Sequence, residues 1–516
     1  MEKVKILWVD DEIELLKPHI LFLERKGYVL STANNGEDAL DMIDNEVYDI
    51  IFLDENMPGI SGLETLSLIY ENHNIPVVMI TKSEEEYIME EALGSKISDY
   101  LIKPVNPHQI LLSLKKNLDT KRLVNEKVTS NYQKEFREIS MALLDVRSLK
   151  EWVEIYQKLV HWEIELDKID ASGMLEILEI QKNEANSQFF KYVKSNYKSW
   201  LKDGDETPIL SHTIMKEKVF PNLSNDKPNF FLLIDNLRYD QWKILQPIIE
   251  EWFTIDEESS FCSILPTATQ YSRNSIFSGL TPLDISRRFP HLWKNDHEEG
   301  GKNLHEKEFL EDQMQRLGMA ENKMVYHKVV KQQYGEKLVQ QFNNLLQNDL
   351  NVIVYNFVDM LSHSKTDMDM IRELAGNDKS YRALTKTWFE NSSLLEMLKK
   401  IANSGSYLFL TTDHGTINVR VPSKVIGDRE TSANLRYKSG KRLQYQVKDV
   451  MVIENPEEYF LPAANLTSSY IFAKENLYLT YPNNYNHFVK YFRDTYQHGG
   501  VSMEEMICPF IRLSPR

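Results

Sequence analysis

The sequence has little cysteine and no long hydrophobic run. Only Cys262 and Cys508 occur among 516 residues, far apart and without the spacing of metal ligands. This scarcity argues against a disulfide framework and suits a reducing compartment. No apolar stretch approaches the ~18–20 residues that cross a bilayer, and the opening residues MEKVKILWVDDE enter a strand pattern without signal-peptide architecture. We therefore expect a cytoplasmic protein with no membrane insertion.

Positive charge is also in short supply. The chain has 60 lysines and arginines against 77 aspartates and glutamates, for a formal net charge of −17. Affinity for the phosphate backbone of long nucleic acids needs clustered basic residues, and no helix-turn-helix pattern is visible between or after the candidate domains. We expect no direct binding of double-stranded DNA, whereas a short nucleotide held by metal ions is compatible with this charge.

Proline is absent from residues 120–200, and glycine occurs there only at Gly173. Apolar residues at three- and four-residue spacing predict three helices in this region, over residues 135–146, 149–166 and 173–201. We predict a small helical domain in which the large aromatic residues form the core and not a ligand cage, as for Trp152, Tyr156 and Trp162. Turn chemistry in KDGDETP (202–208) marks the end of this domain.

Strand and helix patterns alternate on both sides of that region. In residues 3–118 the apolar runs 5–9, 48–53 and 76–80, with helical spacing at 13–27 and 107–118, predict five βα units around a parallel sheet. Residues 209–516 resume the alternation, with strands at 229–235, 351–359 and 406–413 and helices at 237–252 and 381–402. The length itself predicts two to four domains. We predict an α/β multidomain protein with domains at 1–120, 121–205 and 206–516.

Polar residues gather where the strands of the first domain end. Asp10 and Asp11 follow the first strand, Asp54 the third, Thr81 the fourth and Lys103 the fifth. The carboxyl ends of strands in an open parallel sheet are where ligands bind. Carboxylates this close repel one another unless a hard cation such as Mg²⁺ joins them, and a lysine suits a phosphoryl group.

These residues, in the stretches WVDDE, LDENMPG, ITK and DYLIKP, resemble the response-regulator receiver family across the whole first domain. The resemblance implies that Asp54 is phosphorylated by a sensor histidine kinase and that Mg²⁺ is held by Asp10, Asp11, Asp54 and Asn56. It further implies that Thr81 and Lys103 contact the phosphoryl group and that Tyr100 is the rotameric switch. Receivers usually respond by pairing, so a phosphorylation-favoured homodimer through this domain is implied.

A second group of Asp and His residues follows the strands of the C-terminal region. The stretches LLIDN, NFVDMLSHS, TTDHG and YQHGG supply the candidate ligands Asp235, Asp359, His363, Asp413, His414 and His498. Gly415 relieves crowding behind Asp413 and His414, although Asp-His-Gly alone is often only a surface turn. Oxygen and imidazole ligands without sulfur suit two Zn²⁺ or Mn²⁺ ions in a catalytic site.

The stretch ILPTATQYSRNSIFSG predicts a helix that begins just after Thr267-Ala268-Thr269 and ends at Gly279. A threonine at this position is usually a helix cap. The same geometry directs a hydroxyl and backbone N–H groups at an anion, and a metal would make that hydroxyl a nucleophile at neutral pH. Arg273, one turn later, either binds a phosphate oxygen of the substrate or forms a solvent-exposed salt bridge.

The motifs IDNLRYD, PTATQYSR, DHG and HGG, in this order, resemble the PglZ branch of the alkaline phosphatase superfamily over roughly 209–516. The resemblance implies that Asp235, Asp413 and His414 bind one metal together with Thr269. It implies that Asp359, His363 and His498 bind the other. Thr269 is then the nucleophile, because the family places that residue two positions after the Pro-Thr pair.

As a whole the chain resembles PorX-type response regulators, a family associated with type IX secretion. That resemblance implies a sigma factor or a secretion-machinery component as a partner. Three functions stay open. The first is a regulated phosphodiesterase acting on small nucleotide-type substrates. The others are a phosphomonoesterase or transferase, and a non-catalytic metal-containing module that signals by protein contact. The basic residues Arg436, Lys438, Lys441 and Arg442 are either a solvated loop or a contact for an oligonucleotide.

Overall fold

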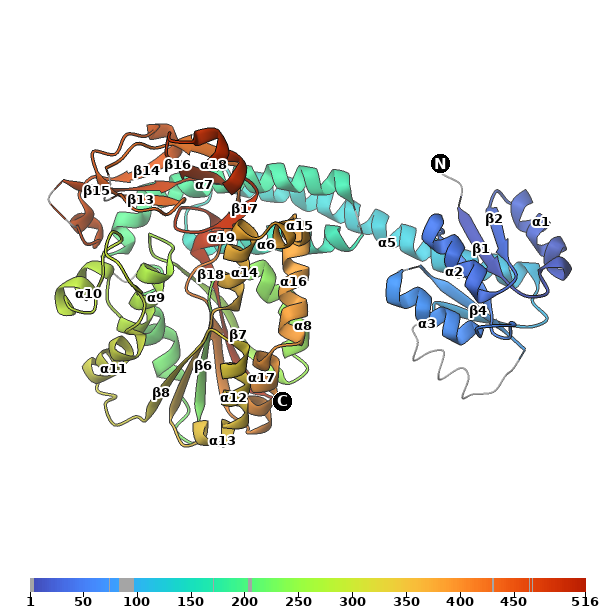
Figure 1. Cartoon of the computed structure of the whole chain (residues 1–516), viewed down its shortest axis with the longest axis horizontal. Coiled ribbons are helices and arrows are strands. Elements are labelled where there is room, and N and C mark those ends of the chain that lie inside the picture. The colour runs from blue at the N-terminus through green and yellow to red at the C-terminus, as the bar shows by residue number, and fades with distance from the viewer. Residues whose placement is uncertain are drawn as a thin grey trace. The chain divides into compact units, whose positions relative to one another are not determined.

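The computed structural model describes residues 4–73, 75–82, 97–169, 171–202, 207–428, 431–463, 465 and 467–516, apart from the side chains of 119–126, 172, 367 and 369. It divides into two compact units, Met1–Lys134 and Glu135–Arg516. Each unit has its own sheet and core (Figure 1). The three-domain division expected from the sequence stays a prediction. Within the described residues, no helix combines the length and apolarity needed to cross a bilayer.

The first unit is the α/β domain expected from the sequence. Its parallel sheet has the order β2-β1-β3-β4-β5, from strands β1 (Lys5–Val9), β2 (Val29–Ala33), β3 (Ile50–Asp54), β4 (Val77–Thr81) and β5 (Asp99–Ile102). Its helices are η1 (Ile13–Leu16), α1 (Lys17–Arg25), α2 (Gly36–Asn45), α3 (Gly62–Asn72) and α5 (Pro107–Ala142). Residues 83–96, between β4 and β5, lie outside the described part, so the helix of the fourth βα unit stays a prediction. Strands β3 and β4 are buried throughout, as expected for apolar strands covered on both faces.

Two of the three predicted central helices are present as separate helices that pack within the second unit, whereas the helix expected over 135–146 is the end of α5. Helix α6 (Leu149–Lys168) starts at a capping box of Ser148 and Glu151, and α7 (Ser172–Trp200) follows it. The aromatic core is confirmed, because Trp152, Tyr156 and Trp162 are all buried. The ring of Tyr156 lies 6.0 Å from that of Tyr239, on α8 (Tyr239–Ile249) of the same unit.

The second unit is built on a six-stranded mixed sheet of order β7-β18-β10-β6-β9-β8. Strands β10 (Tyr407–Thr411), β6 (Asn229–Ile234), β9 (Leu350–Tyr355) and β8 (Met324–Val329) are parallel to one another. Strand β18 (Ile507–Pro515) is antiparallel to both β10 and β7 (Phe253–Cys262). Figure 1 shows these strands between α9 (Thr269–Ser278) and α11 (Glu306–Arg316) on one side and α8, α16 (Asp378–Glu390) and α17 (Ser393–Asn403) on the other.

The remaining elements complete the second unit. Its other α-helices are α10 (Pro282–Arg288), α12 (Gln332–Gln340), α13 (Phe342–Leu345), α14 (Phe357–Asp367), α15 (Asp369–Leu374), α18 (Tyr485–Phe492) and α19 (Met503–Met506). Its smaller sheets pair β11 (Ile417–Val419) with β17 (Thr495–Gln497) and β12 (Val421–Lys424) with β16 (Leu477–Thr480). A third small sheet joins β13 (Tyr437–Lys441), β15 (Ser468–Ala473) and β14 (Val450–Ile453).

Element boundaries differ from the sequence prediction at two further places. The strand expected over 351–359 ends at Tyr355, and Asp359 lies in the first turn of α14. The helix expected over 381–402 is two helices, separated at Asn391 and Ser392. In both cases an uninterrupted apolar pattern continued across a change of direction, which hydrophobic periodicity alone does not reveal.

Candidate functional site

The first unit brings its predicted site residues together at the carboxyl edge of the sheet. One carboxylate oxygen from each of Asp10, Asp11 and Asp54 lies within 4.8 Å of the others. Lys103 Nζ lies 2.9 Å from Asp10 Oδ2 and 2.9 Å from Asp54 Oδ1. Burial raises the pKa of Asp54, and Asp10 adds to this effect, while the hydrogen bond from Lys103 opposes it. Three carboxylates against one lysine leave negative charge for a hard cation, so the residues fit Mg²⁺.

The other receiver residues take different positions. Thr81, at the end of β4, is buried and donates its hydroxyl hydrogen bond to Glu55. Tyr100 on β5 is 41% exposed, and Asn56 is exposed just after Asp54. Sequence reasoning missed Glu55: an acid beside Asp54 was visible, but its hydrogen bond with Thr81 on the neighbouring strand was not.

The second unit forms two groups of candidate ligands, and the first group is Asp235, Asp413 and His414. All three are fully or almost fully buried. Strands β6 and β10 are parallel neighbours in which Leu233 pairs with Thr411. Asp235 and Asp413, each two residues further on, therefore reach the same level at the edge of the sheet.

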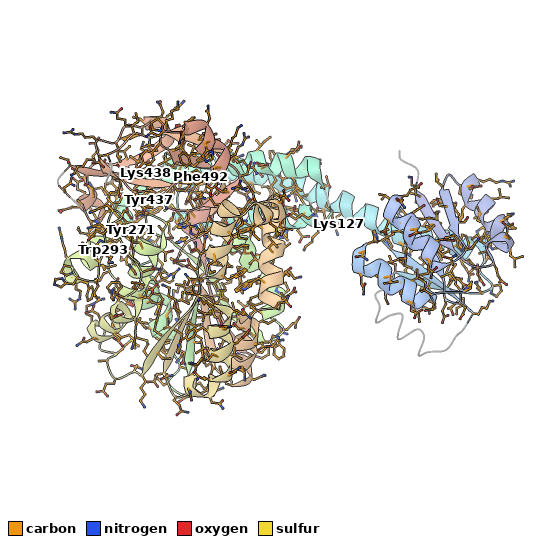
Figure 2. The ribbon with its side chains drawn as sticks, in the orientation of Figure 1. Lys127, Tyr271, Trp293, Tyr437, Lys438 and Phe492 are labelled. Atoms are coloured by element: carbon orange, nitrogen blue, oxygen red, sulfur yellow. The ribbon has the colours of Figure 1, made fainter. Side chains whose placement is uncertain are left out.

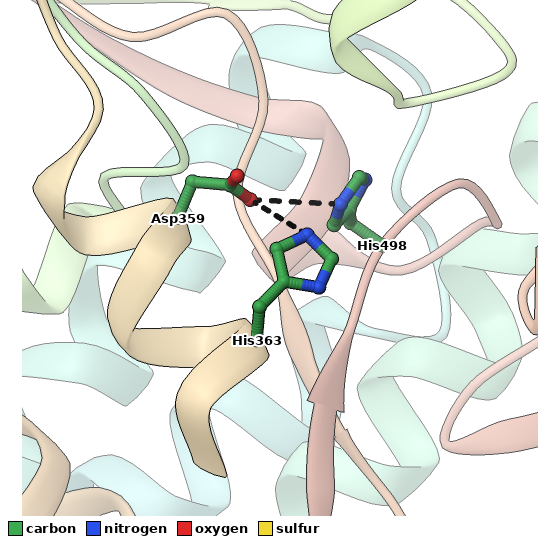
Figure 3. Close-up of side chains that lie close together, drawn as sticks. All are labelled: Asp359, His363 and His498. Atoms are coloured by element: carbon green, nitrogen blue, oxygen red, sulfur yellow. Dashed lines mark ion pairs between the residues drawn. The ribbon is translucent and has the colours of Figure 1, made fainter. Parts of the chain in front are cut away.

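The second group is Asp359, His363 and His498 (Figure 3). Asp359 and His363 are one helical turn apart on α14, so they share a face. Asp359 Oδ1 lies 3.5 Å from His363 Nε2 and 3.8 Å from His498 Nε2. The two groups are adjacent, because the rings of His414 and His498 stack with centroids 4.2 Å apart.

Thr269 is the first residue of α9, and its hydroxyl lies 3.2 Å from His414 Nε2. The helix has no side-chain cap, so this threonine is not used in the ordinary capping role. Helix α9 ends at Gly279, whose φ of 62° is the left-handed cap expected from the sequence.

Aromatic packing fixes the first turn of α9. The ring of Tyr271 packs edge-to-face against Trp293 and Tyr437, at 5.7 and 5.9 Å (Figure 2). The hydroxyls of Tyr271 and Tyr437 both donate to Asp296, at 3.0 and 2.9 Å. These buried contacts hold the helix start, and with it Thr269, in a defined position.

The histidines are oriented as ligands. Nδ1 of His498 lies 3.1 Å from the Thr267 carbonyl, and Nδ1 of His414 lies 3.1 Å from the Gly415 carbonyl. A carbonyl only accepts hydrogen bonds, so each Nδ1 carries a proton and Nε2 is the ring nitrogen that faces the site. Burial, with His414 adding to it, holds the pKa of His498 well below its usual range. The imidazole is therefore neutral, the form that binds metals.

The donor set in the second unit fits divalent ions. Asp235 Oδ1 is buried without a hydrogen-bond partner. Burial raises the pKa of Asp235 well above its usual range, although Arg273 opposes this. Burial alone would also raise the pKa of Asp413, but Arg273 and His414 bring it down to about 2. The single arginine does not neutralise both Asp235 and Asp413, so the site can accept a further cation. Oxygen and imidazole donors suit Zn²⁺ or Mn²⁺.

Arg273 is not placed as the sequence suggested. Its side chain is fully buried, so the prediction of a solvent-exposed salt bridge is wrong. The guanidinium contacts the carboxylates of Asp235, Asp413 and Glu306. It therefore faces the first ligand group and has no exposed surface with which to bind a substrate. The sequence did not show this, because the three carboxylates come from segments far apart along the chain.

Two of the four residues of the basic run differ from both readings made from the sequence, whereas Lys441 is half-buried and Arg442 is exposed. Arg436 and Lys438 are buried, at 0% and 1% exposure (Figure 2 labels Lys438). Arg436 forms a two-pronged ion pair with Glu505, which in turn accepts a hydrogen bond from the Gly500 N–H. These two residues neither lie in a solvated loop nor face a nucleic acid; Arg436 supports the loop that carries His498.

Sequence reasoning also missed that Thr267 connects two segments of the site. Its hydroxyl accepts a hydrogen bond from the Gly499 N–H and donates one to the Gly500 carbonyl, each at 3.0 Å. The segment before Thr269 is thereby joined to the loop of His498. Both motifs were recognised separately in the sequence, but their contact exists only in the fold.

Family models match three parts of the chain. They are described as a response regulator receiver domain (residues 6–115), a PorX response regulator linker domain (122–201) and a BREX system PglZ alkaline phosphatase-like domain (214–513).

Curated relatives match the receiver part. Transcriptional regulatory protein ResD of Bacillus subtilis is 34% identical over 113 residues, 22% of this chain and 47% of its own length. A CpxR homolog of Haemophilus influenzae is 39% identical over 113 residues, 22% of this chain and 48% of its own. The chain thus spans about half the length of these relatives. A solved CheY-like receiver domain protein from Methanospirillum hungatei covers 23% of this chain and 96% of its own at 28% identity, with a TM-score of 0.22.

Proposed function

Because this chain belongs to the family defined by the PglZ alkaline phosphatase-like domain, which matches more than half of it, we propose that its second unit is a metal-dependent phosphodiesterase. The substrates we propose are nucleotide or oligonucleotide phosphodiesters, with Thr269 as the nucleophile. The chain combines a receiver, a PorX linker and a PglZ domain, the architecture of a PorX-type response regulator. We propose that the receiver, phosphorylated on Asp54, regulates the hydrolase.

The position of Thr269 carries the proposal. Its hydroxyl is free of any capping bond and lies 3.2 Å from His414 Nε2, beside the first ligand group. The N-terminus of α9 adds backbone N–H groups and a positive dipole end, which favour a bound phosphoryl group. A threonine that only begins a helix does not require a contact with a candidate metal ligand such as His414.

The chain's residues divide the chemistry among them. In the proposal, Asp235, Asp413 and His414 hold one divalent ion with Thr269, and a second ion is held by Asp359, His363 and His498. Bound ions would supply positive charge at the phosphoryl group and lower the pKa of the attacking hydroxyl. The Thr269 oxygen forms a bond to phosphorus as the bond to the leaving oxygen breaks. Water then cleaves the phosphothreonine and restores the hydroxyl.

Thr269→Ala tests the assignment directly. We expect the full-length protein, supplied with Zn²⁺ or Mn²⁺, to hydrolyse bis-p-nitrophenyl phosphate and the variant to lose at least ~10³-fold in kcat. Thr269→Ser keeps a hydroxyl and should retain measurable activity. Unchanged activity in Thr269→Ala would reject this residue as the nucleophile. A p-nitrophenyl monoester, tested at equal metal loading, separates a diesterase from a monoesterase or transferase.

The receiver supports the regulatory half of the proposal. The buried Asp10–Lys103–Asp54 arrangement is suited to a phosphoryl group and Mg²⁺. We propose a sensor histidine kinase as phosphodonor, a cytoplasmic location and a homodimer of phosphorylated receivers. A role in type IX secretion, through a sigma factor or a secretion component, belongs to the same proposal. Incubation with Mg²⁺ and acetyl phosphate should label the wild type and not Asp54→Asn; labelling of both would contradict the assignment of Asp54.

A further inference from the structure

Arg273 lies in the second unit one helical turn after Thr269, with 0% of its surface exposed. Its Nε lies 3.0 Å from Asp413 Oδ2, and one terminal nitrogen contacts Asp235 Oδ2. The other terminal nitrogen lies 3.5 Å from Glu306 Oε1. A single planar guanidinium thus spans both carboxylates of the first ligand group, a geometry that a lysine ammonium cannot reproduce.

The arginine leaves part of each carboxylate to other partners. It contacts the Oδ2 atoms, whereas Asp235 Oδ1 is buried without a hydrogen-bond partner. Asp413 Oδ1 accepts from the backbone N–H groups of Asn236 and His414, at 3.3 and 3.1 Å. Arg273 therefore holds both carboxylates from one side, and Asp235 offers an unpaired oxygen on another.

The local charges are not balanced without a further cation. Lys328 Nζ lies 3.0 Å from both oxygens of Glu306, so these two residues compensate each other. Arg273 then faces both Asp235 and Asp413, and His414 Nε2 also lies 3.7 Å from Asp413 Oδ2. Removing Arg273 would leave two buried carboxylates side by side, an arrangement that is strongly unfavourable unless a cation replaces it.

We propose that Arg273 is a positioning residue, the resident counter-charge of the first metal site. It holds Asp235 and Asp413 together in the metal-free chain, and its positive charge lowers the affinity for the ion that shares them. This inference rests on the metal site of the proposed function, but it concerns metal binding and stability and not hydrolysis.

The test compares full-length wild type, Arg273→Met and Arg273→Lys by thermal unfolding, in EDTA and in saturating Zn²⁺, and by titration with Zn²⁺ alone. Without metal, Arg273→Met should unfold at a lower temperature than wild type. Zn²⁺ should close most of that gap, so the zinc-induced rise in midpoint is larger in the variant. By linkage, the variant binds Zn²⁺ about tenfold more tightly or better, because a unit charge ~5 Å from the ion has been removed. Arg273→Lys should fall between the two.

Arg288→Met is the matched control. Arg288 pairs with Asp312 at the surface, and its loss should leave the zinc-induced shift and the zinc affinity as in wild type. Equal zinc affinity in wild type and both Arg273 variants would overturn the proposal. So would a raised KM for the diester with unchanged zinc binding, which would return Arg273 to a substrate-binding role. If Arg273→Met does not fold even with Zn²⁺, the zinc affinity of Arg273→Lys relative to wild type tests the proposal. A wild type that binds no Zn²⁺ would instead refute the metal site itself.

Discussion

At the residue scale, the hydroxyl of Thr267 connects the segment before Thr269 with the loop that carries His498. It bonds to the backbone of both Gly499 and Gly500, directly after His498, and all of these groups are buried. In the sequence Thr267 was only the first threonine of a motif, and in the fold it joins the segment of Thr269 to the segment of His498.

Thr267→Val should therefore destabilise the second unit. The isosteric change leaves a buried N–H and a buried C=O unpaired, at a cost of about 1–3 kcal/mol. Urea unfolding of the full-length protein measures it, with Thr267→Ser as the control that keeps the hydroxyl and stays within about 1 kcal/mol of wild type. Equal losses in both variants would mean that the methyl group, and not the hydroxyl, matters.

Gly415 is required for a close approach of backbone to backbone. A Cβ added there would lie 2.0 Å from the carbonyl oxygen of Glu504, an atom that cannot turn aside. The sequence suggested that this glycine relieves crowding behind Asp413 and His414, and the observed contact agrees.

Gly415→Ala should cost at least about 1–3 kcal/mol, because overpacking against backbone has no inexpensive relief. Displacement of His414 should accompany that loss and weaken Zn²⁺ binding, as measured by titration. Gly173→Ala is the comparison, since nothing lies within 4 Å of an added Cβ there. In that helix, alanine should stabilise by roughly 0.5–1 kcal/mol. A harmless Gly415→Ala would show that the strand end can shift freely.

At the scale of elements, an ion network joins the linker helices to the catalytic fold. Arg382 on α16 lies 2.8 Å from Glu163 of α6 and 2.8 Å from Asp240 of α8. Asp240 also accepts from Arg238, whose other end lies 2.7 Å from Asp378. Such buried pairs add little net stability over apolar packing, but breaking one leaves an uncompensated charge. The network therefore fixes the register of these helices.

The network predicts loss of stability in acid. Burial alone would raise the pKa values of Asp240 and Glu163, but neighbouring cations lower both. Arg238 and Arg382 lower the pKa of Asp240. Lys182 and Arg382 lower the pKa of Glu163. In the unfolded chain the pKa is 3.8 for Asp240 and 4.5 for Glu163. A carboxylate whose pKa is lower in the folded protein stabilises the fold at pH values above its unfolded pKa. This stabilisation is lost as the pH falls through the folded-state pKa. The contribution of this network to the free energy of unfolding should be flat above about pH 5 and fall below about pH 4.

Arg382→Gln should cost about 3–5 kcal/mol at pH 7 and flatten the acid limb, because the carboxylates lose the partner that lowers their pKa. Lys386→Gln is the matched control on the same helix, since its pair with Glu390 is exposed at 3.8 Å and worth no more than about 1 kcal/mol. Denaturant unfolding at pH 7, 5 and 3.5 gives both quantities. An acid limb as steep in Arg382→Gln as in wild type would contradict this account of the network.

At the scale of the whole molecule, the chain is two compact units, with α5 contributing residues to both. The receiver chemistry and the hydrolase chemistry thus belong to separate cores. We expect beryllofluoride, which mimics the phosphoryl group on Asp54, to shift the chain from monomer toward dimer in sedimentation velocity. Asp54→Asn should not respond. An unchanged sedimentation coefficient in wild type would count against the receiver-dimer proposal.

Much of the fold and the candidate ligands could be predicted from the sequence. Strands such as β1 and β6 are unbroken apolar runs, and the helix of Thr269 has a clear start and a glycine end. Asp235 and Asp413 stood out because acids rarely follow such strands without a reason. The small sheets around β13 and β15 were not predicted, because short antiparallel strands are defined by their partners and not by a long local pattern.

The sequence by itself determined the chemistry that is available: carboxylates, imidazoles and a threonine at the ends of elements whose types follow from hydrophobic periodicity. Only the tertiary structure decided which of these groups meet. The stacking of His414 on His498, the bridge through Thr267 and the burial of Arg273 between Asp235 and Asp413 all join segments that are distant along the chain. Periodicity reports which side of an element is buried, whereas contact, charge compensation and exposure depend on what other elements place against it.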